Sequence, residues 1–316
     1  MLVLLSRRLA SLLLTLAAVS VLIFVVMDVL PGDPAAIMLG TSASPDTLAA
    51  LRSEMGLDQP LIVRYLHWLT GVFTGDLGTS YTYGVPVAGL IYERLAVTVP
   101  LAILAIIISV AIAIPLGVIS ASRRNSAVDY TSSFLSQLFI AVPGFWVGLL
   151  LILVFSITLG ILPSGGFPGW DAGLVAGLQA LLLPAIALAL PQAGVLTRVT
   201  RSSVLEVMNE DFVRTARAKG LSRSRALWRH AVRNALVPVI TILGLQFTFL
   251  IAGAVLIENV FSLPGLGRLA YQALNQRDVI VMQDVVLFFA GLVIIVNFLV
   301  DISYLVLDPR LRGRGA

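Results

Sequence analysis

The sequence contains no cysteine, only two histidines and one lysine, and only 12% of its 316 residues are charged. Without cysteine the chain can form no disulfide bond, no thiolate zinc site and no cysteine nucleophile. Its two histidines, His67 and His230, are too few for a histidine-built metal site. Soluble domains carry about 25% charged residues, so this chain lacks the polar side chains that cover a water-facing surface. These absences argue against a soluble globular enzyme, and the 58% hydrophobic content argues against disorder.

Motifs for nucleotide binding and hydrolysis are missing as well. A P-loop ends in Gly-Lys-Ser or Gly-Lys-Thr, whereas the one lysine, Lys219, stands between Ala218 and Gly220. The sequence has no His-Glu-x-x-His zinc motif and no Gly-x-Ser-x-Gly nucleophile motif. We therefore expect no enzyme activity, no Walker A site, no metal and no cofactor in this chain itself.

Long uncharged runs are what the chain has in abundance. A helix needs about 20 apolar residues to cross a hydrocarbon core of about 30 Å. The runs that meet or approach this length are Leu9–Met27, Leu95–Ser122, Tyr130–Trp170, Ala172–Thr197, Asn234–Ile257 and Val285–Val300. The first run follows two arginines, as in a signal peptide, but it is longer than a signal core and no cleavage site closes it. The sequence thus predicts an all-α membrane protein with six transmembrane helices, the first retained as an anchor.

The run Tyr130–Trp170 has 41 residues and could form one span or two. A single span near residues 132–162 places 16 of the 21 lysines and arginines on one side of the membrane and 5 on the other. Because basic residues concentrate on the cytoplasmic side, this arrangement puts both termini in the cytoplasm. Two spans would place the basic segment Arg198–Arg233 outside, against that rule. The charges therefore favour one span, with Pro143 as a kink within it.

Two segments between the spans are long enough to form structure of their own. Pro31–Ala96 is expected outside, where Ser44 and Pro45 predict the start of a helix and Gly56 its end. At 66 residues this segment is too small for an independent core, so we expect it to pack on the membrane helices as a cap or docking surface. The expected organisation is residues 1–30 as tail and first helix, 31–96 as extracytoplasmic segment, and 97–316 as a five-helix core with a cytoplasmic loop at 198–236.

The cytoplasmic loop carries local signals for two helices. Ser203 and Glu206 fit a capping box, which predicts the start of the first helix. Gly220 supplies a left-handed stop, and Ser222 can cap a second helix. The prediction is two short basic helices, at about residues 203–218 and 222–234, joined at Gly220.

The charge of this loop allows two interpretations. Arginines beside anionic lipid head groups would satisfy the membrane topology, and the same charges could dock a partner protein. Only two aromatic residues, Phe212 and Trp228, accompany the basic side chains, which argues against nucleic acid binding. The chain has no ATP site of its own but has an expected cytoplasmic projection. This combination suggests that a separate protein supplies the energy for its function.

Asp301 is expected in the inner half of the sixth span, four residues after Asn297 and on the same helix face. An ionisable residue at membrane depth could serve a proton or ion relay. A single carboxylate makes a poor relay, so a hydrogen bond between helices near the cytoplasmic interface is the simpler interpretation.

The stretch Arg214-Thr215-Ala216-Arg217-Ala218-Lys219-Gly220, followed by Leu221, resembles the EAA-type coupling loop of permeases in binding-protein-dependent ABC importers. The resemblance is strongest to the dipeptide/oligopeptide/nickel branch, which tends to show Arg-Thr-Ala where the general motif has Glu-Ala-Ala. Further matching motifs run along the chain: Pro31-Gly32-Asp33-Pro34, Gly56-Leu57-Asp58-Gln59-Pro60, Gly75-Asp76-Leu77-Gly78, Arg233-Asn234-Ala235-Leu236-Val237-Pro238, Gly244-Leu245-Gln246, Glu258 to Gly267, and Asp308-Pro309-Arg310.

The resemblance implies a type I importer permease in the cytoplasmic membrane. Two permease subunits, usually unlike in this branch, would form the pore. Two cytoplasmic ATPases would bind ATP and Mg, and an extracytoplasmic binding protein would deliver short peptides. Nickel or glutathione-type substrates remain alternatives within the family. An ion- or proton-coupled carrier and a non-transporting scaffold remain alternatives outside it.

The resemblance also implies roles for particular residues. The coupling loop would sit in a groove of the ATPase, where Ala216 and Gly220 are needed for their small size. Its basic residues, Arg214, Arg217 and Lys219, could pair with acidic residues of the ATPase. Glu258, Pro264 and Gly265 could belong to an external gate, or to an ordinary turn.

Overall fold

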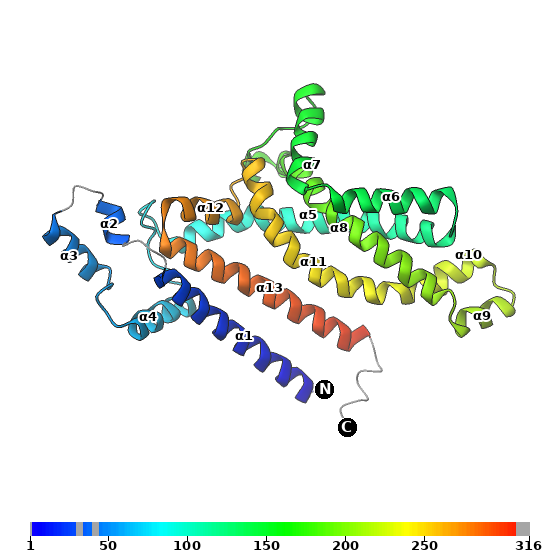
Figure 1. Ribbon diagram of the computed structural model, residues 1–316, viewed down its shortest axis with the longest axis horizontal. Helices are drawn as coiled ribbons and strands as arrows, with labels where there is room; N and C mark the ends of the chain where they lie inside the picture. Colours follow the sequence, from blue (N-terminus) through cyan, green and yellow to red (C-terminus); the bar gives the residue numbers. More distant parts are fainter. Residues whose placement is uncertain (1, 30–33, 40–43, 308–316) are drawn as a thin grey trace. The chain divides into compact units, whose positions relative to one another are not determined.

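The computed structural model describes residues 2–29, 34–39 and 44–307, and within these ranges the regular structure is helical (Figure 1). An isolated bridge between Thr79 and Pro86 is the exception. The chain divides into two compact units, Met1–Thr98 with Pro264–Ile295, and Val99–Leu263 with Val296–Ala316. Of the motifs noted above, Pro31-Gly32-Asp33 and Asp308-Pro309-Arg310 lie outside the described residues. The all-helical fold expected from the sequence is confirmed.

The first unit contains the described part of residues 31–96 and parts of the helices that flank this segment. Its helices are α1 (Leu2–Val29), α2 (Pro34–Leu39), α3 (Pro45–Glu54), α4 (Leu61–Thr74), α12 (Leu266–Gln276), the start of α5 (Val87–Ser122) and most of α13 (Val279–Leu307). The predicted start and end of α3 are confirmed. The Ser44 hydroxyl accepts a hydrogen bond from the Thr47 backbone N–H at 3.2 Å, and Gly56 follows the helix with φ +66°.

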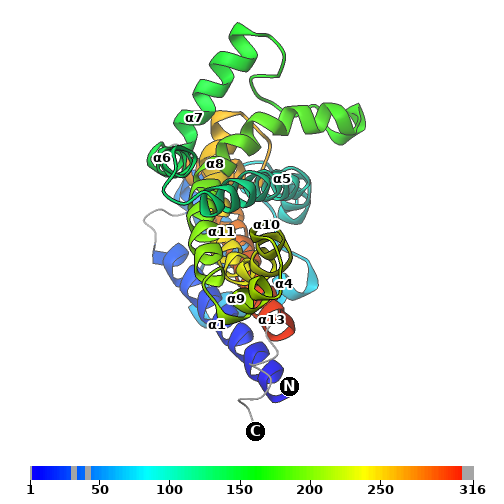
Figure 2. The same ribbon diagram turned by 90° about the vertical axis from the view of Figure 1, so that its right-hand side faces the viewer.

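Helix α4 packs on α1 and α13 through polar contacts. Arg64 forms an ion pair with Asp28 of α1 at 2.6 Å, and the hydroxyls of Tyr65 and Ser20 lie 2.9 Å apart. The indole N–H of Trp68 donates to Asp284 of α13 at 2.7 Å. Figures 1 and 2 show α1 and α13 side by side. Helix α4 is therefore held against α1 and α13 by three polar contacts.

The loop between α4 and α5 is organised around Asp278, which precedes α13. The Asp278 carboxylate accepts hydrogen bonds from the Ser80 hydroxyl at 2.5 Å and from the Thr82 backbone N–H at 3.0 Å. It also accepts from the Val281 backbone N–H at 3.3 Å, which makes Asp278 the N-terminal cap of α13. Burial and the nearby Asp278 carboxylate raise the pKa of Tyr81 in the same loop to about 12. This phenol therefore stays neutral at physiological pH.

The second unit contains the remaining helices. They are the rest of α5, α6 (Ala127–Ala141), α7 (Gly144–Leu151), the π-helix Ile152–Thr158, the 3₁₀ turn Trp170–Ala172, α8 (Leu174–Val207), α9 (Asp211–Ala218), α10 (Arg223–Ala226), the π-helix Leu227–Ala231, α11 (Val232–Val260) and the end of α13. Figures 1 and 2 show α9 and α10 side by side, at the end of α8 that lies away from α7.

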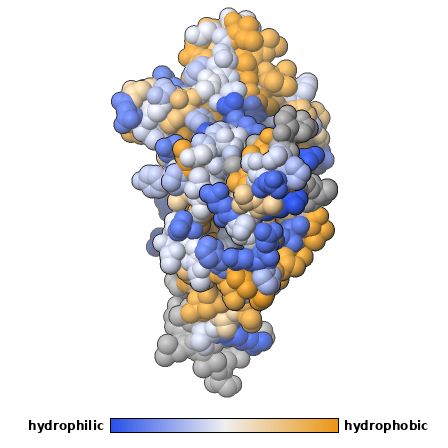
Figure 3. Space-filling view, turned by 90° about the vertical axis from the view of Figure 1, so that its left-hand side faces the viewer, coloured by the Kyte–Doolittle hydropathy of each residue, from blue (hydrophilic) through white to orange (hydrophobic). Residues whose placement is uncertain are grey.

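The described helices supply five candidate membrane spans, or six if α6 and α7 together form one broken span. Many large apolar side chains on these helices are exposed, among them Leu14 at 71% and Phe134 at 68%. Figure 3 shows such hydrophobic side chains on the surface beside hydrophilic ones. Exposed apolar surface on helices of this length and hydropathy is suited to contact with lipid.

The kink predicted at Pro143 is instead a break between two helices. The axes of the segments Ala127–Ala141 and Gly144–Thr158 differ by 99°. Proline has no N–H to donate and disfavours a helical residue before it, and Val142 accordingly adopts an extended ψ of 126°. The expected kink within one continuous helix was therefore wrong, because the proline ends α6 rather than bending it, while α6 and α7 can still form one broken span.

The capping box predicted at Ser203 was also wrong. Ser203 lies inside α8, which continues from the membrane run to Val207, and its side chain is buried. The backbone N–H groups that a capping serine would satisfy are already bonded within that helix. The short helix begins later, at Asp211, after a turn in which the Glu210 N–H donates to the Val207 carbonyl at 3.1 Å.

The second predicted helix does begin after Ser222, but it does not end near Asn234. The helical segment Arg223–Val260 is continuous for 38 residues, with a π-helical turn at Leu227–Ala231. Pro238 lies inside it, in the second turn of α11. The segment expected as the cytoplasmic loop therefore contains one short separate helix, α9, between the end of α8 and the helical segment that begins at Arg223.

Candidate coupling site

Helix α9 is a short surface helix with one buried anchor. The Glu210 carbonyl accepts hydrogen bonds from the N–H groups of Val213 and Arg214, both at 3.1 Å, which starts the helix. The side chain of Val213 is fully buried, whereas that of Phe212 is 45% exposed. Asp211 in the first turn complements the positive end of the helix dipole. One fully buried side chain thus anchors a helix whose other residues, apart from the half-buried Ala216, are exposed.

The end of α9 is a complete Schellman motif. The Gly220 N–H donates to the Arg217 carbonyl at 2.9 Å, and the Leu221 N–H donates to the Ala216 carbonyl at 3.2 Å. Gly220 has φ +93°, which confirms the predicted left-handed stop. Ala216 and Leu221 are half-buried, as is common for the apolar pair that accompanies this motif.

The chain turns back into the unit directly after this stop. The Ser222 hydroxyl accepts from the Arg225 N–H at 3.4 Å and caps α10, as predicted. Leu227, Ala231 and Val232 then pack with Val118 of α5 and Val204 of α8 in a buried apolar cluster. The projecting loop is therefore rooted in a packed core that joins three long helices.

The basic side chains of the loop point outward. Arg214, Thr215, Arg217, Ala218, Lys219 and Gly220 are all exposed. Arg214 lies 3.6 Å from Asp211, but both side chains are so exposed, at 68% and 97%, that this ion pair adds little stability. The structure brings the predicted coupling residues together on one solvent-facing turn, with their charge available to another molecule.

The predicted gate residues lie in different local settings. Glu258 is fully buried in the last turn of α11, and its carbonyl accepts from the Leu263 N–H at 2.8 Å. Gly265 is the N-terminal cap residue of α12, after Pro264. The predicted turn from Glu258 to Gly267 is thus confined to residues 261–265, because both flanking helices extend into it. Asp301 belongs to α13, and its side chain lies outside the described residues.

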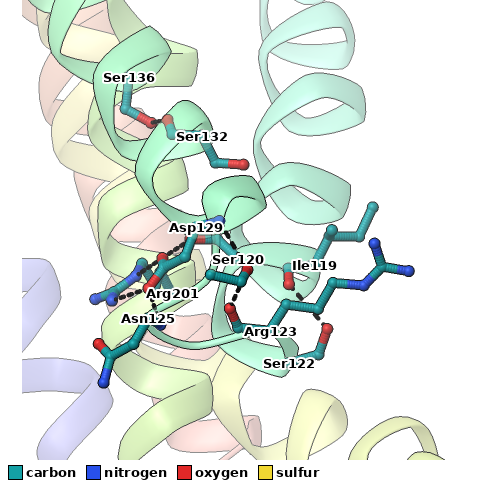
Figure 4. Close-up of polar contacts among 10 residues, drawn as sticks. Ile119, Ser120, Ser122, Arg123, Asn125, Asp129, Ser132, Ser136 and Arg201 are labelled. Atoms are coloured by element: carbon teal, nitrogen blue, oxygen red, sulfur yellow. Dashed lines mark hydrogen bonds and ion pairs between the residues drawn. The ribbon is translucent and has the colours of Figure 1, made fainter.

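Sequence reasoning missed a buried polar cluster at the root of this loop (Figure 4). Asp129, in the first turn of α6, accepts two hydrogen bonds from Arg201 of α8, at 2.7 and 2.8 Å. It also accepts from the Ser120 hydroxyl of α5 at 2.5 Å and from the Asn125 backbone N–H at 2.9 Å. The signal available was Ser126-Ala127-Val128-Asp129, a helix-start pattern, and Ser126 does cap α6.

In the part of the chain that the structure describes, no three His, Asp or Glu side chains come together in a group that could hold a metal ion.

Comparisons with known proteins match nearly the whole chain. Residues 113–313 match the model of the binding-protein-dependent transport system inner membrane component, and residues 1–102 match the model of its N-terminal part. A peptide transport system permease protein of Brucella abortus is 45% identical over 306 residues, covering 97% of this chain and 98% of the relative. The dipeptide transport system permease protein DppB of Escherichia coli is 40% identical over 332 residues, covering 98% of each chain.

The fold also resembles a solved transporter. The structure of the inward-facing MetNI methionine ABC transporter superimposes with a TM-score of 0.59 at 18% sequence identity. The match covers 69% of this chain and 96% of that chain. At this identity the likeness concerns the fold alone.

Proposed function

Because the chain belongs to the family of binding-protein-dependent transport system inner membrane components, we propose that it is a pore-forming subunit of an ATP-driven importer of di- and oligopeptides. The observation that carries the proposal is the exposed turn from α9 to α10. It is small, basic, of fixed shape and rooted between the ends of two membrane helices. The names of the peptide permease relatives support peptides as the substrate class.

The proposed assembly contains this chain, a second and unlike permease subunit, two cytoplasmic ABC ATPases and an extracytoplasmic substrate-binding protein. ATP and Mg would be bound by the ATPases, since this chain has no Gly-Lys-Ser or Gly-Lys-Thr sequence. Residues 31–96 would face the binding protein, and membrane lipid would surround the apolar helices. The charge distribution supports a multi-pass protein of the cytoplasmic membrane with both termini inside.

In the proposed mechanism, α9 rests in a groove of the ATPase. Gly220 lets the chain reverse within one residue, and Ala216 and Ala218 keep the helix thin enough to enter. Arg214, Arg217 and Lys219 would meet acidic residues of the groove. Closure of the ATPase pair on ATP would push α9 and, through it, α8 and α11. ATP would thereby favour an outward-open state, and hydrolysis would restore the inward-open one.

The proposed gate lies at the other end of the membrane helices. Glu258 would act there as a buried structural acid at the end of α11. Pro264 and Gly265 would set the start of α12. For Asp301 we propose the structural role, a polar contact of α13 near the cytoplasmic interface.

The test is uptake of a labelled dipeptide by vesicles that contain this chain with its partner subunits. The proposal predicts uptake that requires ATP and the binding protein and does not require an ion gradient. Uptake by this chain alone, driven by a proton or sodium gradient, would identify a secondary carrier instead. ATP-dependent uptake of nickel or a glutathione-like peptide, but not of dipeptides, would retain the importer and replace the substrate. An assembled complex that transports none of these would support a scaffold.

A further inference from the structure

The ion pair between Asp129 and Arg201 joins α6 to α8 near the end of α8 that leads into the coupling loop. Arg201 lies six residues before the end of α8 at Val207, a distance of about 9 Å along the helix axis. Helix α9 begins four residues after that end, at Asp211. The pair is therefore next to the point at which any force on α9 enters the long helices.

The Asp129 carboxylate is fully engaged by donors from three directions. Its side chain is 4% exposed, and that of Arg201 is 30% exposed. The Arg201 guanidinium binds both carboxylate oxygens in a planar fork, and Ser120 and the Asn125 backbone add one donor to each oxygen. A carboxylate offers about four acceptor positions, so this arrangement fills them all. The geometry fixes orientation as well as distance between α5, α6 and α8.

Close packing surrounds the pair along α8. A Cβ on Gly117 of α5 would lie 2.6 Å from Cβ of Thr200, and a Cβ on Gly194 of α8 would lie 2.6 Å from the Ser136 carbonyl oxygen of α6. Helix α8 thus touches α5 and α6 with no room for an added methyl group. Contacts this tight transmit displacement, because packed interiors yield little.

A contribution to folding stability alone does not explain why a buried ion pair stands at this position. A buried ion pair costs desolvation, and an apolar replacement of both partners is often neutral or stabilising. What the fork supplies and apolar packing does not is a fixed register between the helices it joins. The pair lies between the coupling loop and the helices α5 and α6. At this position a fixed register would let a movement of α9 reach both helices.

We propose that Arg201 and Asp129 are positioning residues that make the cytoplasmic ends of α5, α6 and α8 move as one body with α9. The inference rests on the proposed function. In the absence of the fork, a push on α9 would move α8 without moving α6 to the same extent. ATP hydrolysis would then continue while substrate movement lagged.

The test uses the complete transporter with the double variant Asp129→Asn/Arg201→Met. Changing both residues leaves no unpaired buried charge, so the chain is expected to assemble. We expect dipeptide uptake per ATP hydrolysed to fall about tenfold, a typical size for coupling between sites, with complex yield and basal ATPase activity unchanged. The matched control is Arg198→Met, one turn earlier on α8 and exposed, which should keep the wild-type ratio. A wild-type ratio in the double variant would overturn the proposal.

A second readout is independent of the substrate. The chain has no cysteine, so spin labels can be placed on Tyr130→Cys of α6 and Asp211→Cys of α9, both exposed positions. The proposal predicts one label-to-label distance that ATP does not change in the wild type, and an ATP-dependent change in the double variant. Identical behaviour of the two would overturn it. If the wild type takes up no dipeptide, the proposed substrate fails while this distance still decides the role of the pair.

Discussion

The backbone N–H of Leu221 donates to the carbonyl of Ala216, five residues earlier, at 3.2 Å. Together with the bond from Gly220 to Arg217, this contact closes α9 by backbone hydrogen bonds alone. The shape of the projecting turn therefore depends on one residue, Gly220, that can adopt φ +93°. The basic side chains around it are free to contact a partner without also holding the turn together.

Substitutions at Gly220 can distinguish the effect of its backbone conformation from the effect of an added side chain. A Cβ at this position would meet no other atom of this chain within 4 Å, so within the chain only the backbone conformation is at stake. Gly220→Val should cost roughly 1–2 kcal/mol in the left-handed region and reduce uptake strongly. Gly220→Asn should retain most uptake, because asparagine tolerates this conformation. The measurement is ATP-dependent uptake at matched complex yield, and equal uptake by the two variants would contradict the explanation.

The two exposed aromatic side chains of the loop are expected to anchor the ATPase. Phe212 is 45% exposed and Trp228 57% exposed, although large aromatic side chains gain more from burial than others. Alanine at either position should weaken ATPase binding by about 1–2 kcal/mol without lowering the thermal stability of this chain. Tyr130→Ala on α6, 68% exposed, is the matched control and should bind normally. Binding can be measured by titrating the ATPase into detergent-solubilised permease.

Gly165 is expected to be essential for the contact between the loop before α8 and the end of α11. A Cβ there would lie 2.4 Å from the Phe261 carbonyl oxygen, a backbone atom that also accepts from the Gly166 N–H at 2.8 Å. Gly165→Ala should destabilise the chain by about 1–3 kcal/mol. Gly89→Ala, at a helical site with open space, should be neutral or slightly stabilising. Thermal unfolding in detergent checks both, and equal melting temperatures would contradict the assignment.

The pair of Asp129 and Arg201 should show strong non-additivity in stability. Arg201→Met alone leaves a buried carboxylate without its main partner and should cost roughly 3–5 kcal/mol. Asp129→Asn added to it should recover most of that loss, because no buried charge then remains. Thermal unfolding of the wild type, the two single variants and the double variant gives the coupling energy. Additive losses would show that the two side chains do not depend on each other.

Local signals in the sequence predicted the parts of the site that local contacts determine. Gly220 and Ser222 were assigned correctly, because a left-handed stop and a helix cap involve neighbours within a few residues. Ser203 failed for the opposite reason. Its capping pattern is real, but a membrane helix that already bonds the same backbone groups runs through it.

Long-range geometry was beyond the sequence. Asp129 and Arg201 are 72 positions apart, and no local pattern indicates that they meet. Pro143 predicted a change in helix direction at this point. The angle between α6 and α7 depends on what α7 packs against after the break, as the close approach of Gly148 to the Phe261 ring illustrates. The uncharged runs predicted six spans, because the thickness of a membrane fixes the length of a span. The described helices supply five at those places, or six if α6 and α7 form one broken span.

The most direct test of the central claim is protection of the coupling loop by the ATPases. Ala218→Cys would be the only cysteine in the chain and is exposed at the end of α9. In inside-out vesicles, a membrane-impermeant maleimide should label it rapidly without the ATPases and about tenfold more slowly when they are bound, which corresponds to roughly 1.4 kcal/mol. A cysteine at Arg124, in the exposed turn between α5 and α6, should label equally in both conditions. Equal labelling of Ala218→Cys with and without the bound ATPases would contradict the account.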